Sequence, residues 1–274
     1  MVENTPSVGI VIPTRNSSRT LSACLHSIRD QTFPCELVVV DNHSTDETKE
    51  IASRFADQVL SAGPERSAQR NIGAASIKVD ILGFIDSDMV LSPNVVTDAV
   101  KLIAEGAGAV IVPERTVGLG YWAKVRAYER TFYLADEKTE AARFFDAVLF
   151  RKLGGFDEAI TGPEDLDLTI RARKSARIAR SSATIDHFEC YSGYLDACRK
   201  KGYYVSGVIA FGRKHGRSRF LSFVDRGFLH SPWKLLKSPL LGVSVLLLKV
   251  GEAGAMLEHL TRQQGCRGQN SHRR

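Results

Sequence analysis

Four short apolar runs in the first 112 residues predict buried β-strands. They are rich in β-branched residues, are bounded by turn residues, and cover 8–12 (VGIVI), 37–40 (LVVV), 81–85 (ILGFI) and 109–112 (AVIV). Continuous apolar runs of this length are typical of strands that are buried on both faces, as in a mostly parallel sheet.

Helical patterns separate these strands. Residues 44–47 (STDE) have the spacing of a capping box and predict a helix that ends near Phe55. Ser92 and Pro93 predict an N-cap and a first helical residue before a segment with one apolar face, made by Val96, Ala99, Val100 and Ile103. The alternation of strand and helix predicts an α/β fold, a three-layer Rossmann-like sheet with helices on both faces.

The pattern weakens after Pro113. The sequence predicts a helical, aromatic stretch over 114–142, then a strand over 147–150 and a glycine-rich loop over 154–165. A helix over 166–176, a short strand over 183–188 and a basic helix over 191–215 are predicted to follow. We expect one domain over 1–190, with halves at about 6–112 and 113–190. A basic helical appendage over 191–262 and a disordered tail over 263–274 follow.

Charge is unevenly distributed along the 274 residues. The net charge is +6, but the segment from Arg199 to the end contains 15 Lys and Arg against 3 Asp and Glu, so it carries +12 and the preceding part −6. A basic tail of this kind suits an anionic surface. Five scattered cysteines and a polar N-terminus predict reduced thiols in a cytoplasmic protein without a signal peptide.

Polar residues follow three of the predicted strands. These are PTRN at 13–16, DNHS at 41–44 and DSD at 86–88. Ligands of parallel α/β sheets bind at the carboxyl ends of strands, so these segments are expected on one edge. A pair of aspartates there suits a hard divalent cation, although Asp-x-Asp alone is also common in surface turns.

Six motifs occur in an order that resembles glycosyltransferase family 2, whose members have the GT-A fold. They are IPTRN, VVVDNHSTD, ERSAQRNIGAA, ILGFIDSDM, LGGFDE and GPEDLDLTIRA, and together they cover roughly 6–190. The resemblance implies a nucleotide-sugar glycosyltransferase that inverts the anomeric carbon, uses Mg²⁺ or Mn²⁺, and takes a UDP, GDP or dTDP sugar as donor. The aromatic segment 119–133 lies outside the shared pattern.

The resemblance also implies roles for individual residues. The nucleotide-sugar would contact Pro13, Arg15, Asn16, Asp41, Arg70 and Asp86. The metal would be held by Asp88, with Asp86 beside it and His187 as a further ligand. Asp165 would be the catalytic base, with Glu164 as its catalytic neighbour.

Structural alternatives exist for several of these residues. Asp41 could cap the following helix. Arg66 and Arg70 could form a solvated helix face. Glu164 and Asp165 could complement a helix dipole, which is compatible with catalysis. His187 could be a core histidine.

The C-terminal appendage suggests a membrane surface. Its run PLLGVSVLLL has ten apolar residues before Lys249, short of the roughly 20 needed to span a bilayer. Basic residues flank the run: Arg213, Lys214, Arg217, Arg219, Arg226, Lys234 and Lys237. We expect an interfacial helix on anionic lipid at the inner face of the cell membrane, where the acceptor would be a glycan, a lipid or a lipid-linked glycan. An ordinary packed helix is the alternative, and nucleic acid is not an expected partner.

Two other functions are compatible with a sheet of this kind. A sugar nucleotidyltransferase would have a glycine-rich loop after the first strand, whereas IPTRNSS contains no glycine. A non-catalytic module that binds a nucleotide-sugar or a membrane would share the fold but would not need Asp165.

Overall fold

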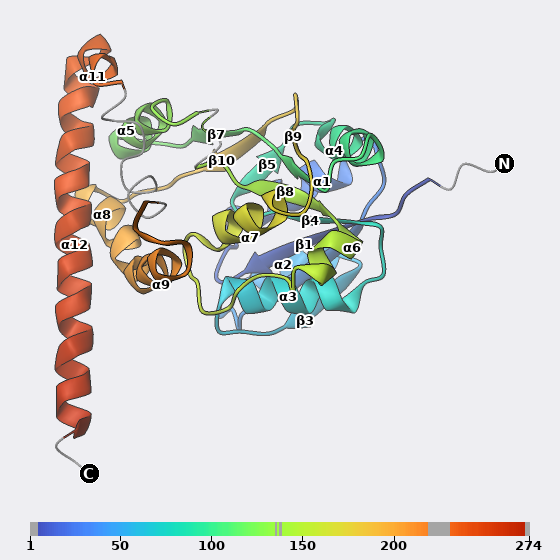
Figure 1. Ribbon diagram of the computed structural model, residues 1–274, viewed down its shortest axis with the longest axis horizontal. Helices are drawn as coiled ribbons and strands as arrows, with labels where there is room; N and C mark the ends of the chain where they lie inside the picture. Colours follow the sequence, from blue (N-terminus) through green and yellow to red (C-terminus); the bar gives the residue numbers. More distant parts are fainter. Residues whose placement is uncertain (1–4, 135, 137–138, 219–230, 272–274) are drawn as a thin grey trace. The chain divides into compact units, whose positions relative to one another are not determined.

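The computed structural model describes residues 5–134, 136, 139–218 and 231–271 (Figure 1). The chain divides into two compact units. Unit 1 comprises residues 1–115, 135–158 and 164–188, and unit 2 comprises 116–134, 159–163 and 189–274. The aromatic segment after residue 115 therefore belongs with the C-terminal appendage.

A seven-stranded sheet forms the centre of unit 1. In sheet order, its strands are β3 (Gln58–Ser61), β2 (Glu36–Asp41), β1 (Val8–Thr14), β4 (Ile81–Phe84), β8 (Ala142–Asp146), β6 (Ala109–Ile111) and β9 (Ile178–Arg180). β1 pairs in parallel with β2 and β4, β2 with β3, and β6 with β9. Within this sheet only β8 is antiparallel to its neighbours, β4 and β6. The prediction of a mostly parallel sheet is confirmed.

Helices cover both faces of this sheet, as Figure 1 shows. One layer contains α1 (Leu21–Arg29), α2 (Thr48–Phe55) and α4 (Val95–Ala104), and the other contains α3 (Arg66–Ser76), α6 (Ala147–Lys152) and α7 (Glu164–Arg173). Side chains alternate along a strand, so adjacent residues of β8 enter different layers. Phe144 packs in the first core and Phe145 in the second. The expected three-layer fold is therefore present.

A smaller sheet consists of β5 (Met89–Leu91), β10 (Ile185–Phe188) and β7 (Glu114–Val117). β5 and β10 are antiparallel, with His187 opposite Met89. The backbone N–H of Phe188 donates to the carbonyl of Asp88 at 2.8 Å. This pairing brings His187 next to Asp88, although the two residues are far apart in the sequence.

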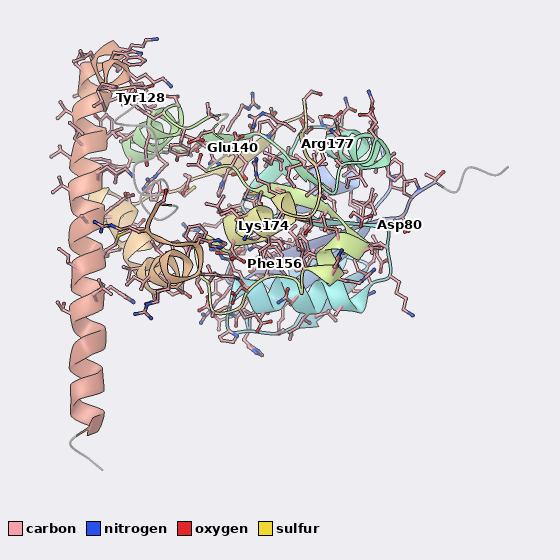
Figure 2. All side chains as sticks on the ribbon, viewed as in Figure 1. Asp80, Tyr128, Glu140, Phe156, Lys174 and Arg177 are labelled. Atoms are coloured by element: carbon pink, nitrogen blue, oxygen red, sulfur yellow. The ribbon has the colours of Figure 1, made fainter. Side chains whose placement is uncertain are left out.

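Unit 2 is built largely from helices, namely α5 (Tyr121–Arg130), α8 (Tyr194–Tyr203), α9 (Val205–His215), α11 (Trp233–Lys237) and α12 (Pro239–Ser271). Tyr128 of α5 donates its hydroxyl to the backbone carbonyl of Lys234 in α11 (Figure 2). The apolar core of the unit comes from α5, α8 and α12, and its buried residues are Val125, Ala197, Cys198, Val245 and Leu248.

Two local predictions are wrong. Residues 147–150 begin α6 instead of forming a strand, because the Asp146 carboxylate accepts a hydrogen bond from the N–H of Leu149 at 2.8 Å and caps the helix. The tail expected to be disordered is helical up to Ser271, where α12 ends, and residues 272–274 lie outside the described part.

Several predicted boundaries also shift. The helices expected after Ser44 and Ser92 begin at Thr48 and Val95. Within 114–142 only α5 is a regular α-helix among the described residues. α12 is longer than its apolar run of ten suggested: the stretch Pro239–Arg262 is 24 residues long, an 18-residue window in it has a mean hydropathy of 1.8, and 28% of that window is buried. By length and composition alone, this helix could cross a membrane.

Candidate functional site

The strand directions bring the predicted loops to one edge of unit 1. β1, β2 and β4 are parallel, so their carboxyl ends share an edge, and Thr14 pairs in register with Asp41. Asp86 follows β4 at this edge. β6 has the same direction as β4, because β8 is antiparallel to both, so Glu114 also comes to this edge. Polar side chains from four strand ends therefore meet there.

The loops after β1 and β2 are bonded to each other. The backbone N–H of Asn16 donates to the Ser44 hydroxyl at 2.8 Å, and the side-chain Oδ1 of Asn16 accepts from the N–H of Thr45 at 2.9 Å. Asn16 has a φ of +49°, which asparagine tolerates better than most residues. Pro13 is buried, whereas Arg15 and Asn16 are exposed. Arg15 and Asn16 are thus the members of this loop that a ligand can reach.

Asp41 serves the local backbone in this structure. It is fully buried and accepts hydrogen bonds from the N–H of Ser44 at 3.0 Å and from the Ser44 hydroxyl. Lys49 Nζ lies 3.7 Å from the same carboxylate. Asp41 therefore fixes the 41–44 turn, and its contact with a nucleotide base stays a prediction.

A buried arginine lies at the centre of the site. Arg70 of α3 has no exposed surface, and its guanidinium contacts Asp86 at 2.5 Å, Asp165 at 2.9 Å and Glu164 at 3.1 Å. Burial alone would lower the pKa of Arg70, but the three carboxylates raise it above its ordinary value. A solvated helix face is therefore excluded for this residue. Its structural partners are acidic side chains, and contact with a nucleotide stays a prediction.

The two acids that begin α7 differ in exposure. Glu164 is 1% exposed and pairs with Arg66 and Arg70, both at 3.1 Å. Burial raises the pKa of Glu164, but Arg66 and Arg70 lower it below its usual range. The Asp165 side chain is 17% exposed, and burial raises its pKa despite contacts with two arginines. Asp165 is thus the better placed of the two to accept a proton.

Two residues of this site were missed in the sequence, Arg143 of β8 and Glu114 of β7. Arg143 contacts Asp165 at 3.0 Å, Asp86 at 3.5 Å and Glu114 at 2.7 Å. A charged residue in the apolar segment ARFFD signals an internal partner, because arginine is rarely buried without one. Glu114 follows a strand end just as Asp86 does, and that position was its signal.

His187 lies between Asp88 and Glu114. Its Nε2 is 3.4 Å from Asp88 Oδ1, and its Nδ1 is 3.4 Å from Glu114 Oε2. Burial lowers the pKa of His187, but its hydrogen bonds with Asp88 and Glu114 outweigh that effect and raise the pKa to about 10. Both ring nitrogens of His187 therefore have acidic partners, and its role as a metal ligand stays a prediction.

Asp88 and His187 fit a divalent cation that takes its remaining ligands from a substrate. Within the described residues, no group of three or more His, Cys, Asp or Glu side chains is arranged to hold a metal by itself. Mg²⁺ is commonly bound by one or two carboxylates plus phosphate oxygens, and imidazole is a ligand for several transition metals. Arg70 and Arg143 contact the two oxygens of Asp86, and its place beside the metal stays a prediction.

The Arg-Asn-x-Gly segment of α3 has a structural reason at each fixed position. Asn71 accepts from the N–H of Phe156 at 2.9 Å and donates to the Phe156 carbonyl at 3.0 Å, so it holds the glycine-rich loop. The Arg70 guanidinium lies 5.1 Å from the Phe156 ring, which is labelled in Figure 2. A Cβ on Gly73 would collide with Val11, so only glycine allows α3 to pack this closely on β1.

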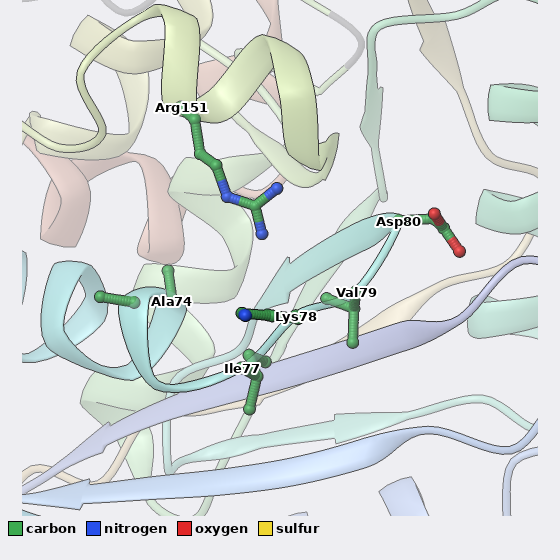
Figure 3. Close-up of a pocket in the computed structure, with 7 residues that line it drawn as sticks. Ala74, Ile77, Lys78, Val79, Asp80 and Arg151 are labelled. Carbon is green, nitrogen blue, oxygen red and sulfur yellow. The ribbon is translucent and has the colours of Figure 1, made fainter.

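A cavity elsewhere in unit 1 is not the candidate site. Its volume is about 510 Å³, and it is lined by Lys78, Arg151, Asp80 and apolar residues where α3 ends and β4 begins (Figure 3). This is the amino end of the strands, opposite the edge where ligands of such sheets bind. Asp80 Oδ2 accepts hydrogen bonds from the hydroxyl and the N–H of Ser7, at 2.7 and 2.8 Å.

Comparison with known proteins places the chain among glycosyltransferases. The model of the family "Glycosyl transferase family 2" matches residues 9–156. The succinoglycan biosynthesis protein ExoA of Rhizobium meliloti is 29% identical over 196 residues, which cover 61% of this chain and 58% of ExoA. The glycosyltransferase AglE of Haloferax volcanii is 35% identical over 98 residues, 32% of each chain. The chain spans 32% of the length of AglE and 58% of that of ExoA.

Solved structures show the same fold. The mannosyltransferase PcManGT from Pyrobaculum calidifontis, in complex with GDP-Man and Mn²⁺, has a TM-score of 0.66 at 19% identity, covering 94% of this chain and 88% of its own. TarS 1–349 of S. aureus, in complex with UDP-GlcNAc, has a TM-score of 0.57 at 19% identity, covering 92% and 81%. At these identities the likeness concerns the fold alone, and it confirms the expected GT-A architecture.

Proposed function

Because this chain belongs to glycosyl transferase family 2, we propose that it transfers a sugar from a nucleoside-diphosphate sugar to an acceptor hydroxyl, with inversion at the anomeric carbon. The observation that carries this proposal is the group of ionisable side chains at the carboxyl edge of the sheet. Asp88 and His187 lie at one side of the group and Asp165 at the other. Arg143 contacts Asp165 and Asp86, and Glu114 contacts Arg143 and His187.

The donor would bind at the loops after β1 and β2. Arg15 and Asn16 are exposed there, and Arg15 offers a guanidinium to phosphate or ribose oxygens. PcManGT binds GDP-Man and TarS binds UDP-GlcNAc, which supports a nucleoside-diphosphate sugar for this chain as well. We infer a UDP, GDP or dTDP sugar.

Asp88 and His187 would hold Mg²⁺ or Mn²⁺. When bound, such an ion supplies positive charge that neutralises the departing diphosphate. The complex of PcManGT contains Mn²⁺, which supports a divalent cation in this fold. Glu114 would orient the His187 ring, because it lies at the nitrogen that faces away from Asp88.

Asp165 would act as the catalytic base. Its partly exposed carboxylate would take the proton of the acceptor hydroxyl as that oxygen bonds to the anomeric carbon and the bond from this carbon to the diphosphate breaks. Arg70 and Arg143 hold one oxygen of Asp165 each and fix its orientation. Glu164 is buried against Arg66 and Arg70, which supports a positioning role for it.

The acceptor is proposed to be a lipid or lipid-linked glycan at the cytoplasmic face of the membrane. Unit 2 contains 18 Lys and Arg against 6 Asp and Glu, a formal charge of +12, whereas unit 1 carries −6. A basic surface attached to a sugar-transfer unit suits an acceptor that is presented by anionic lipid.

A nucleotide-sugar panel with Mg²⁺ or Mn²⁺ tests the proposal. We expect one nucleoside diphosphate plus metal to raise the melting temperature of the wild type and of Asp165→Asn alike. Transfer, measured as nucleoside diphosphate released with acceptor present, should fall by about 10²-fold or more in Asp165→Asn. The exposed Asp30→Asn variant is the matched control and should retain transfer. Release of pyrophosphate from a nucleoside triphosphate and a sugar 1-phosphate would favour a nucleotidyltransferase. Nucleotide binding without transfer, in the wild type and Asp165→Asn alike, would favour a binding module.

A further inference from the structure

The outer face of α12 in unit 2 carries a continuous apolar stripe. The spacing of its members by three, four or seven residues places them along one side of the helix. Their exposed fractions lie between 50% and 71%. Apolar surface of this extent on a soluble protein usually marks a binding surface. This outer stripe consists of Leu240, Val243, Leu246, Leu247, Val250 and Leu257.

The charged residues of this part of α12 take part in an ion-pair cluster with α5. Between Pro239 and Leu257 the sequence contains only two charged residues, Lys249 and Glu252. Glu252 is buried, and it accepts hydrogen bonds from Arg126 of α5 at 2.6 Å and from Lys249 at 2.7 Å. The side of α12 that packs against α5 therefore contains ion pairs, and its exposed side contains leucine and valine. A helix whose exposed side is in water has the opposite arrangement.

The charge of unit 2 identifies the partner of the outer stripe. With a formal charge of +12, this unit would repel a second copy of itself but would be attracted to anionic lipid headgroups. α11, immediately before α12, contains the exposed residues Trp233 and Lys237. Tryptophan and lysine are residues that favour the boundary between acyl chains and headgroups.

The packing of unit 2 determines how α12 can meet a bilayer. Within the described residues of unit 2, α5, α8 and α9 pack against α12 (Figure 1), and the outer stripe stays exposed. A membrane-spanning orientation would carry α5, α8 and the Arg126–Glu252 ion pair into the hydrocarbon, which is costly. Leu240 to Leu257 extends over about 26 Å of helix, long enough to lie on a surface as an interfacial anchor.

We propose that α12 lies in the plane of an anionic bilayer surface, with the outer stripe among the acyl chains and α5 and α8 on the water side. This docking surface deepens the proposed function, because a lipid-linked acceptor would be presented at the same membrane. It rests on unit 2 alone and involves no residue of the candidate site. A binding assay without donor or metal therefore tests it separately from sugar transfer.

The experiment is flotation of the full-length protein with vesicles of phosphatidylcholine alone and of phosphatidylcholine mixed with phosphatidylglycerol. The test variant is Val250→Glu, and Val148→Glu of α6 is the matched control, since both valines are 71% exposed on a helix. We expect the wild type and Val148→Glu to bind the anionic vesicles and to be released by salt. Val250→Glu should bind at least about tenfold more weakly, because its carboxylate would enter the acyl region.

Several outcomes would overturn the proposal. One is that the wild type floats with neither vesicle, and another is that Val250→Glu floats as well as Val148→Glu. A dimer in sedimentation analysis that Val250→Glu dissociates, without vesicle binding, would assign the outer stripe to a second copy of the chain. Resistance of the bound wild type to extraction by alkaline carbonate would show a spanning helix and contradict the in-plane arrangement.

Discussion

Replacing Arg70 by methionine tests the charge balance of the buried site. Methionine has a long, flexible side chain, so the substitution removes the charge while keeping most of the volume. It would leave Asp86, Asp165 and Glu164 without the guanidinium that now lies 2.5, 2.9 and 3.1 Å from them. We expect a large loss of folding stability, because burying an uncompensated carboxylate is far more costly than losing an exposed ion pair.

The magnitude follows from what remains around the three acids. Removal of one partner from a buried ion pair costs about 3–5 kcal/mol. Arg143 stays 3.0 Å from Asp165 and 3.5 Å from Asp86, and Arg66 stays 3.1 Å from Glu164, so the compensation is partial. The lower part of the range, about 3 kcal/mol, is therefore expected, which is more than a hundredfold in the unfolding equilibrium.

The assay is urea unfolding followed by circular dichroism at several pH values. The pKa of Asp86 lies below its usual value in the folded wild type. The contribution of Asp86 to the free energy of unfolding is therefore present above its pKa in the unfolded chain, near 3.8, and is lost as the pH falls. In Arg70→Met the buried acids can take up protons more easily. The difference in the free energy of unfolding between wild type and variant should therefore be largest at neutral pH and should decrease toward pH 4.

Arg54→Met is the control for this experiment, because Arg54 is an exposed helical arginine of the same unit. It should change stability by less than about 0.5 kcal/mol. The reasoning fails if Arg70→Met is as stable as Arg54→Met at neutral pH, or if its deficit does not depend on pH.

Two further predictions concern the metal and the packing of α3. Asp88→Asn should abolish the rise in melting temperature that Mn²⁺ plus nucleotide causes. The rise is measured relative to the free variant, because the substitution also removes the contact between the Asp88 carboxylate and His187. An undiminished rise would exclude Asp88 as a metal ligand. Gly73→Ala should destabilise unit 1 in urea unfolding, because its Cβ would meet Val11 and Val40, and overpacking costs up to about 3 kcal/mol against a helix-propensity gain of about 1 kcal/mol. Gly254→Ala, with no atom near its Cβ, is the control and should be neutral or stabilising, so equal effects of the two substitutions would contradict the packing argument.

The sequence predicts the parts of the fold that are encoded locally. Continuous apolar runs identify β1, β2, β4 and β6, and the polar residues that follow them lie on one edge because parallel strands end together. At residues 147–150 the local pattern alone does not determine the structure. A run of four apolar residues is compatible with a strand or a helix. The Asp146 cap stabilises the helix.

The remaining parts of the site depend on contacts between distant segments. His187 meets Asp88 only through the pairing of β10 with β5, which no local pattern specifies. The burial of Arg70 depends on α7, which supplies Glu164 and Asp165. Spacing in α3 alone was equally compatible with an arginine in solvent.

The position of Arg143 between Asp86, Asp165 and Glu114 has a consequence for assigning roles by mutagenesis. If one of these carboxylates is removed, the Arg143 guanidinium can move closer to the carboxylates that remain. Single substitutions at the metal half and at the base half would then perturb each other, and their energetic effects would not add. A double-mutant cycle through Arg143 is therefore needed before a measured rate loss is attributed to one aspartate.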